Sequence, residues 1–310
     1  MIVLSSKNGK LALKPALDLL KSGATALDAV ERATRIVERN PDDHTVGLGG
    51  LPNLLGEVCL DASIMDGRTL RAGAVGSVQH YVHVITLARR VMEQTPHVFL
   101  VGDGAQRLAA EMGLERENLL TPEAAAQWRD GLQRHFPDLD PAQISAQKDL
   151  STMVQRLNKP MEGWQREESH GTVNFIARDR EGNLATAVST SGWPWSYPGR
   201  LGDSPVVCSG GYADNRWGAA TSTGTGEVVL RTAAARSIAL YMKTGMDVAA
   251  ATCEALGDLR DLDDPYVDHI AIIAIDRHGH HIGYAHRRNE RYAYITDAMD
   301  EPAEADMPAP

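Results

Sequence analysis

The sequence predicts an α+β fold in which β-sheets are packed together and covered by helices. Helical and strand-like patterns alternate up to about residue 111, and two hairpin patterns follow in the second half of the chain. With 310 residues, of which 43% are hydrophobic, the chain has enough apolar side chains for one large domain or two modest ones. Helices and sheets must cover one another's apolar faces, which favours a layered sandwich.

The first part of the chain is expected to begin with a strand at residues 2–4 and two helices. The first helix covers residues 14–21 and is stopped by Gly23. Thr25 is in position to cap the second helix, which ends before Pro41. The elements expected next are a turn at 47–56, strands at 58–65 and 72–78, a helix at 82–93, a short buried strand at 97–101 and a helix at 104–111.

The second part begins with a segment of different composition, between about residues 115 and 168. Prolines and charged residues interrupt the apolar periodicity there, so we expect a linker. The acidic, proline-containing tail at 300–310 is expected to be disordered. The elements expected between them are a hairpin of strands 173–177 and 184–190, helices at 228–243 and 247–259, and a second hairpin of strands 270–275 and 281–285.

Composition excludes several classes of function. A net charge of −10 argues against general affinity for nucleic acid, because binding phosphates requires a basic face. No apolar run approaches the roughly 20 residues of a membrane span, and the N-terminus lacks the pattern of a secretory leader, so we expect a cytoplasmic protein. The three cysteines are far apart without metal-type spacing. We therefore expect neither a metal nor a cofactor.

Thr172 follows Gly171 and starts the first hairpin, a position that suits a nucleophile made by self-cleavage. A threonine hydroxyl needs a base to take its proton, and an α-amino group with a pKa of roughly 7.7 to 8 suits that role near neutral pH. Cleavage before Thr172 would create this amine, after the hydroxyl attacks the preceding carbonyl and water hydrolyses the resulting ester. Gly171 leaves that carbonyl open to attack because it has no Cβ. Taken alone, the sequence Gly-Thr-Val is also an ordinary start of a strand.

Polar residues downstream of this threonine can complete a pocket around it. Thr190 ends the second strand of the hairpin. Arg200 and Asp203 lie in a glycine-bracketed loop and are the cation and anion that a zwitterionic amino-acid head group requires, although a surface salt bridge in a turn is the alternative. Thr223 and Gly224 precede a helix and offer a hydroxyl and backbone N–H groups to a developing oxyanion.

Taken together, these motifs resemble those of glycosylasparaginases, which are N-terminal-nucleophile hydrolases of the plant-type asparaginase superfamily. The similarity extends from about residue 2 to residue 290. In the second half it is carried by residues 170–173, 189–192, 199–205, 211–214 and 223–226. In the first half it is carried by residues 26–31, 45–53 and 60–67.

The resemblance implies a four-layer αββα sandwich of the N-terminal-nucleophile hydrolase type. It implies cleavage into an α-chain, residues 1–171, and a β-chain, residues 172–310, which remain one structural domain. His170, Gly171 and Thr172 would form the cleavage site. A pair of processed αβ units is the implied oligomer.

The resemblance also implies a role for each residue of the pocket. Thr172 would be the nucleophile and amine base, with Thr190 as a neighbouring hydroxyl that tunes it. Arg200 would bind the α-carboxylate of the substrate and Asp203 its α-amino group. Thr223 and Gly224 would form the oxyanion hole.

Two departures from the glycosylasparaginase pattern bear on the substrate. The family usually carries aspartate before the catalytic threonine, whereas Gly171 is more like the asparaginase and isoaspartyl-peptidase branch. A tryptophan typical of the glycan-linked enzymes after the first strand is missing from residues 4–9. Trp193 and Trp195 either supply another aromatic platform or anchor a long loop.

The expected activity is therefore self-processing threonine amidohydrolysis of the side-chain amide of an asparagine derivative, either N4-glycosyl-asparagine or asparagine, with release of aspartate. The first alternative is an isoaspartyl (β-aspartyl) peptidase with asparaginase activity. The alternative from another class is an unprocessed, non-catalytic protein that binds amino acids. In each case the expected partner is a small molecule.

Overall fold

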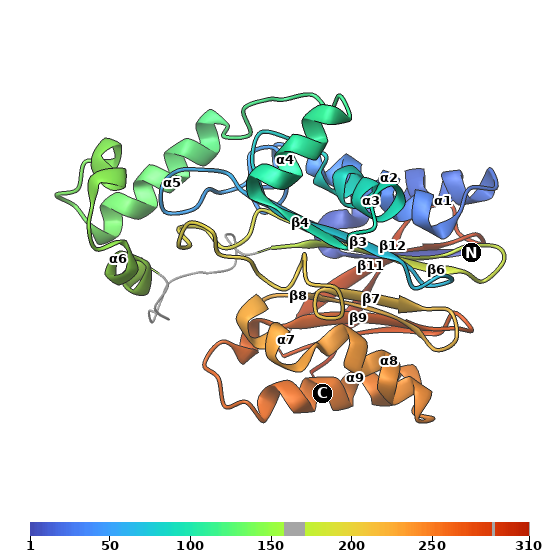
Figure 1. The fold of residues 1–310 in the computed structure, drawn as a ribbon. Helices are drawn as coiled ribbons and strands as arrows, with labels where there is room; N and C mark the ends of the chain where they lie inside the picture. The colour runs from blue at the N-terminus through green and yellow to red at the C-terminus, as the bar shows by residue number, and fades with distance from the viewer. Residues whose placement is uncertain (158–170, 287–288, 310) are drawn as a thin grey trace.

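The computed structural model describes residues 1–157, 171–286 and 289–309 and has a mixed α/β architecture (Figure 1). Its strands are β1 (Ile2–Ser6), β2 (Leu60–Asp66), β3 (Ala72–Val78), β4 (Phe99–Val101), β5 (Val173–Arg178), β6 (Leu184–Thr190), β7 (Gly211–Asp214), β8 (Gly218–Thr223), β9 (Ala271–Asp276), β10 (His281–Ala285), β11 (Glu290–Thr296) and β12 (Ala303–Met307). Its α-helices are α1 (Lys10–Lys21), α2 (Ala26–Glu38), α3 (Val84–Gln94), α4 (Gly102–Glu111), α5 (Pro122–His135), α6 (Leu150–Leu157), α7 (Gly226–Thr232), α8 (Ala234–Lys243) and α9 (Val248–Arg260).

Within the described residues, the strands form two sheets. The larger has the order β12-β11-β1-β5-β6-β2-β3-β4 and the smaller the order β10-β9-β8-β7. Figure 1 shows helices α1 to α4 on one side of the larger sheet and helices α7 to α9 on the far side of the smaller sheet. The layers follow one another in this order: α2 contacts β5 and β6 of the larger sheet, these strands contact β8 of the smaller sheet, and β8 contacts α8.

The alternation of side chains along the central strands divides the apolar core in two. Val3 and Phe175 point to the helical side of the larger sheet, where they join the core formed with α1, α2 and α3. Their neighbours Leu4 and Ile176 belong to the second core, which contains residues of the smaller sheet and of α8 and α9. Because successive residues of a strand face opposite sides, β1 and β5 bury both of their faces.

Strand pairing brings four chain segments to one place. β1 pairs with β5 in antiparallel register, so Ser6 at the end of β1 lies beside the start of β5. β6 pairs with β5 with Ser189 opposite Val173, and Thr190 is therefore close to the residues just before β5. β8 ends at Thr223 and packs against β5 from the smaller sheet.

Most expected helices and strands are confirmed, with two differences, one in each part of the chain. Thr25 caps α2 through a capping box with Asp28. The helix expected at 228–243 is divided into α7 and α8, because Ala233 has a left-handed conformation with φ +49°. β4 is not the buried strand expected: Val101 is 51% exposed, since β4 is at the edge of the larger sheet.

The linker expected between residues 115 and 168 is wrong for its described part, which extends to residue 157. Helices α5 and α6 form there and enclose a small apolar cluster that includes Trp128 and Leu132. Pro122 does not interrupt α5 but stands at its first turn, where a missing backbone N–H costs nothing, and the Thr121 side chain caps the helix. Residues 158–168 of the expected linker lie outside the described residues.

The C-terminal tail is also more ordered than expected. Residues 303–307 form β12, which pairs with β11 along the edge of the larger sheet. Glu304 of this strand is neutralised by ion pairs with both Lys10 and Arg291. Met307 is buried and contributes to the core beneath β11. Among the described helices, none has the length and apolar character needed to cross a membrane.

Candidate active site

Thr172 immediately precedes β5 and is nearly buried, with 6% of its surface exposed. Its carbonyl oxygen lies 3.3 Å from the Ser6 hydroxyl at the end of β1. Among the described residues, none forms a hydrogen bond with the Thr172 hydroxyl. The side chain borders two cavities, one small and one large. The backbone of Thr172 is therefore held in place, while its hydroxyl has no hydrogen-bond partner among the described residues.

Thr190 contacts the carbonyl group that precedes Thr172. Its hydroxyl donates to the Gly171 carbonyl oxygen at 2.9 Å and accepts from the Gly192 amide at 3.0 Å. The single hydrogen of this hydroxyl faces the Gly171 carbonyl more closely than the Thr45 carbonyl oxygen, which lies 3.5 Å away. Such a donor polarises a carbonyl that is to be attacked and stabilises the oxyanion that forms. His170, the other residue of the expected cleavage site, lies outside the described residues.

Gly171 is fitted closely against Thr45. A Cβ at position 171 would lie 2.5 Å from the Thr45 hydroxyl oxygen and 2.8 Å from its Cβ, closer than real contacts allow. Thr45 cannot move away easily, because its hydroxyl donates to Asp43 at 2.6 Å and its carbonyl accepts from the Ser191 amide at 2.8 Å. The neighbouring Thr45 side chain therefore leaves no room for a residue larger than glycine before Thr172.

Arg200 is held in the small cavity by an ion pair. Its Nε and one Nη donate to the two carboxylate oxygens of Glu227, both at 2.8 Å. Its guanidinium also lies over the Trp193 ring, 5.2 Å from the centroid. A guanidinium has five N–H donors, so the edge formed by the two Nη atoms remains for a substrate carboxylate. Gly192 and Gly202, which also line the small cavity, leave room beside Nη1.

Asp203 lines the same small cavity and is 4% exposed. It accepts a hydrogen bond from the Ser222 hydroxyl at 2.9 Å. Burial raises the pKa of this carboxyl to about 6, although Ser222 and Arg200 favour its charged form. A second buried carboxyl, Asp61 opposite Thr190 in the sheet, has its pKa raised to about 7 by burial. An ammonium group in the cavity would restore the charge of Asp203 and be bound by it.

Thr223 and Gly224 lie at the end of β8, where β8 turns into α7. Gly224 has φ +131°, and a Cβ there would lie 1.9 Å from the His269 carbonyl oxygen, so only glycine fits. In the described part of the chain, no group accepts a hydrogen bond from the Gly224 amide. Gly224 lines the small cavity and Thr223 the large one, on either side of Thr172.

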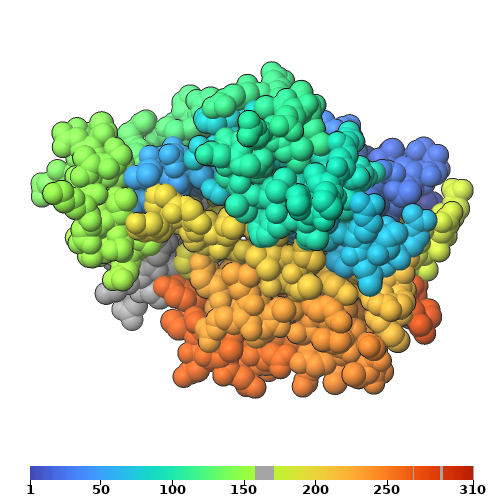
Figure 2. All heavy atoms as spheres, viewed as in Figure 1, coloured from blue at the N-terminus to red at the C-terminus, as the bar shows by residue number. Residues whose placement is uncertain are grey.

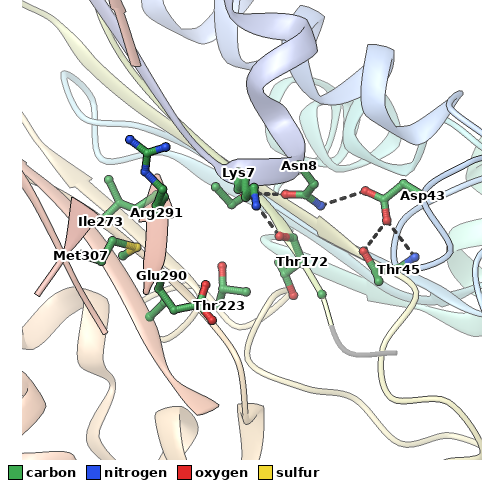
Figure 3. Close-up of a pocket in the computed structure, with 13 residues that line it drawn as sticks. Lys7, Asn8, Asp43, Thr45, Thr172, Thr223, Ile273, Glu290, Arg291 and Met307 are labelled. Carbon is green, nitrogen blue, oxygen red and sulfur yellow. Dashed lines mark hydrogen bonds between the residues drawn. The ribbon is translucent and has the colours of Figure 1, made fainter. Parts of the chain in front are cut away.

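The large cavity has a volume of about 500 Å³ and opens beside Thr172 (Figure 3). Figure 3 shows Lys7, Glu290 and Arg291 around it, together with the apolar side chains of Ile273 and Met307. Arg291 is already engaged by Glu304 and Asp306. None of the described residues that line this cavity is aromatic. The small cavity, in contrast, has a volume of about 20 Å³.

The structure adds polar residues that the sequence did not single out. The Ser6 hydroxyl donates to Asn8 at 2.7 Å, and the Asn8 amide donates to Asp43 at 2.9 Å (Figure 3). Asp43 in turn accepts from Thr45, so this network leads from the Thr172 carbonyl to the residue against Gly171. Each member has a residue type common in turns, and only the pairing of β1 with β5 shows that they meet.

The two tryptophans of the loop after β6 have different positions. Trp195 is a buried anchor, since its indole N–H donates to the Trp128 carbonyl at 3.1 Å within the cluster of α5 and α6. Trp193 lines the small cavity and lies 5.7 Å from the Tyr266 ring. Figure 2 shows the loop, coloured yellow, at the surface between the green and orange parts of the chain.

The candidate site fits an amidohydrolase of the N-terminal-nucleophile type, and the comparisons with known proteins support that class. A family model described as asparaginase matches residues 5–302. The chain belongs to this asparaginase family, and the resemblance inferred from its motifs is confirmed.

Curated relatives in this family have two kinds of name. The chain is 40% identical to an N(4)-(β-N-acetylglucosaminyl)-L-asparaginase of Elizabethkingia miricola, over 82% of this chain and 68% of that protein. It is 34% identical to an isoaspartyl peptidase/L-asparaginase of Danio rerio, over 87% of this chain and 79% of that protein. It is also 39% identical to an isoaspartyl peptidase of Escherichia coli, over 76% and 68% respectively. Identities in this range do not separate the two substrates.

Proposed function

We propose that this protein cleaves itself before Thr172 and then hydrolyses the side-chain amide of asparagine derivatives, releasing aspartate. The observation that carries the proposal is the convergence of Thr172, Arg200, Asp203 and Gly224 on one small cavity. A nucleophile, a cation, an anion and a free backbone amide are the groups that an α-amino acid with a reactive side-chain carbonyl requires. The family relationship supports the same reaction class.

Self-cleavage begins with attack of the Thr172 hydroxyl oxygen on the Gly171 carbonyl carbon. Thr190 stabilises the resulting oxyanion, because its hydroxyl already donates to the Gly171 oxygen. The hydroxyl proton passes to the Thr172 nitrogen as the C–N bond breaks, which leaves Gly171 as an ester of the Thr172 hydroxyl and frees the Thr172 amine. Water then hydrolyses the ester, which yields a C-terminal carboxylate on Gly171 and restores the hydroxyl. The products are an α-chain of residues 1–171 and a β-chain of residues 172–310.

Turnover uses the amine and hydroxyl of Thr172 together. Arg200 binds the α-carboxylate of the substrate through its free Nη edge, and Asp203 binds the α-ammonium group. The Thr172 amine takes the hydroxyl proton as the oxygen attacks the side-chain carbonyl, and Thr223 and Gly224 stabilise the oxyanion. The same amine returns the proton to the leaving nitrogen. Water then hydrolyses the acyl-enzyme to aspartate by the same steps.

The large cavity supports isoaspartyl peptidase activity as a second candidate function. A sugar leaving group is commonly held by stacking on an aromatic side chain, and no described lining residue supplies one. Lys7 instead lines the large cavity together with Thr172, on the side of Thr172 that remains for a leaving group when the small cavity holds the amino-acid head group. An ammonium group suits the carboxylate of a leaving amino acid. Comparing the turnover of a β-aspartyl dipeptide, asparagine and N4-glycosyl-asparagine distinguishes the candidates.

The proposed function is tested by the intact mass and N-terminal sequence of the purified protein under denaturing conditions. We expect two chains, one of which begins at Thr172. Thr172→Ala is expected to remain a single chain and to hydrolyse none of the three substrates. A wild-type chain that stays uncut and binds amino acids without turnover would contradict the proposal and favour a binding protein.

We further propose that the layers seen in Figure 1 correspond to the four-layer αββα sandwich of N-terminal-nucleophile hydrolases. The processed αβ unit is proposed to pair with a second copy. Edge strand β4 supports such an assembly, because it and the residue before it expose Val98, Phe99 and Val101. Sedimentation of the wild type and of Phe99→Asp tests whether this edge is the contact.

A further inference from the structure

Asn174 is a polar residue in the middle of the core, two residues after Thr172 on β5. Its side chain is buried, with 1% of the residue exposed. It reaches from the larger sheet to the end of β8 in the smaller one, where its amide nitrogen donates to the Ser222 carbonyl oxygen at 3.0 Å. The same nitrogen donates a second hydrogen bond to the Thr223 hydroxyl oxygen. Asn174 thus connects the strand of the proposed nucleophile to the proposed oxyanion hole.

The partners of Asn174 fix the direction of each hydrogen bond. The Ser222 carbonyl can only accept, so the side-chain group that faces it must be the NH₂ group of Asn174. One of its two hydrogens goes to Ser222, and the other goes to Thr223. The Thr223 oxygen is therefore an acceptor in this pair, and its own hydrogen must point elsewhere.

The hydrogen of the Thr223 hydroxyl has no acceptor among the described residues. Thr223 lines the large cavity beside Thr172, as Figure 3 shows. A hydroxyl that accepts from one side and is free to donate on the other is a preorganised donor, because its hydrogen is already aimed away from Asn174. Without Asn174, the hydroxyl hydrogen would be free to turn toward other acceptors such as the Ser222 carbonyl.

This arrangement is not explained by stability. The Asn174 side-chain oxygen is buried and has no hydrogen-bond partner among the described residues. Leaving a buried acceptor unsatisfied costs on the order of 1–3 kcal/mol, and an apolar residue at this core position would avoid that cost. Because Asn174 occupies this strand position despite the cost of its unsatisfied oxygen, we look for its role in the hydrogen bonds that its amide group donates.

We infer that Asn174 is a positioning residue that orients the Thr223 hydroxyl toward the oxyanion formed during turnover. The inference rests on the proposed function, since it concerns the same reaction. Asn174 does not touch the substrate; it acts through Thr223. Its effect is confined to turnover, because the Gly171 carbonyl attacked in self-cleavage is bound by Thr190 instead.

A double-mutant cycle of Asn174→Ala and Thr223→Val tests this role, since valine keeps the shape of threonine without its hydroxyl. We expect Thr223→Val to lower kcat by roughly 10²-fold, as for other lost oxyanion donors, and Asn174→Ala by roughly tenfold, with little change in KM. In the Thr223→Val background, Asn174→Ala should have no further effect on kcat. Asn174→Asp, which offers only acceptors to Thr223, should reduce kcat more than Asn174→Ala.

The outcomes separate the inference from the proposed function. If the wild type is cut before Thr172 and active, but Asn174→Ala lowers kcat equally in both backgrounds, the orienting role is wrong while the proposed function stands. If Asn174→Ala slows self-cleavage as much as turnover, Asn174 has a general structural role and the inference is again wrong. An inactive, uncut wild type rejects the proposed function itself. Asn118→Ala, at an exposed site, is the control for the substitution.

Discussion

Thr172 lies between two cavities, one of about 20 Å³ and one of about 500 Å³. The small cavity contains the buried Asp203 and an arginine held by Glu227 on one edge. The large cavity is bordered by Lys7, which is exposed, and by apolar side chains of β9 and β12. The two cavities beside Thr172 therefore differ in volume, in the burial of their charged groups and in how tightly their lining side chains are held.

This difference indicates for which part of a substrate the protein is more specific. The backbone is packed tightly behind Asp203 of the small cavity, since a Cβ at Gly226 would lie 2.7 Å from the Asp203 amide nitrogen. Buried charges that have fixed partners discriminate strongly, because a substrate lacking the matching group leaves them unpaired. Exposed charges on long side chains discriminate weakly. We therefore expect high specificity for the acyl part of the substrate and low specificity for the leaving group.

The largest effect is expected from Asp203→Asn, which preserves shape in the small cavity and removes the anion. Losing the partner of a buried charge costs about 2–5 kcal/mol, so kcat/KM for asparagine should fall by about 30- to 5,000-fold. For a substrate analogue without the α-amino group, kcat/KM should fall far less, because this analogue has no ammonium group to pair with Asp203. Steady-state kinetics with both compounds check this. Equal losses for both would contradict a role in binding ammonium.

A smaller effect is expected from Gly171→Ala, which places a Cβ against Thr45 in the uncut chain. Overpacking of this kind commonly costs about 1–3 kcal/mol, so self-cleavage should slow by roughly 10- to 100-fold. Turnover per cleaved molecule should be unchanged, because Gly171 becomes the free end of the α-chain. Time courses of chain cleavage, followed by kinetics on the cleaved fraction, measure the two effects separately.

Gly104→Ala is the matched control for that experiment, because a Cβ at Gly104 meets nothing within 4 Å. It should cleave at the wild-type rate. If Gly171→Ala also cleaves at the wild-type rate, the fit against Thr45 does not explain the glycine.

The sequence predicted the strands around the site better than the contacts between them. The hairpin of β5 and β6 and the residues Thr172, Thr190, Arg200 and Asp203 could be identified because glycine turns and alternating patterns are local signals. That Asp203 and Thr190 line the same cavity depends on pairing and packing between distant segments. For the same reason, Asn174 gave no signal as part of a strand-like run, and only its contact with Thr223 distinguishes it.

The failures of prediction have equally specific causes. Pro122 was interpreted as an interruption, although proline is well suited to the first turn of a helix. The tail was expected to be disordered because it is acidic and contains prolines, and that composition does not show that Glu304 forms ion pairs with Lys10 and Arg291. A charged or proline-containing segment thus needs its partners to be known before it can be assigned as a linker or tail.

A third prediction concerns the pH dependence of turnover. The raised pKa of Asp203, about 6, means that its carboxyl becomes protonated as the pH falls through 6 and can then no longer pair with ammonium. An α-amino group has an ordinary pKa of roughly 8 and loses its neutral form about tenfold per pH unit below that value, and we expect the same of the amine at Thr172 in the cleaved chain. The logarithm of kcat/KM against pH should therefore steepen from a slope of about one to about two below pH 6. The steepening should disappear in Asp203→Asn.

The smallest effect is expected on the other side of Thr172, at Lys7. Exposed ion pairs contribute about 0.2–1 kcal/mol, so Lys7→Gln should raise KM for a β-aspartyl dipeptide by about two- to fivefold and leave asparagine turnover unchanged. The difference should shrink at high salt, because the charge is screened. Lys21→Gln, exposed at the end of α1, is the matched control. Equal changes for both substrates would show that Lys7 shapes the site rather than binding the leaving group, and the contrast between the two cavities would then be one of size alone.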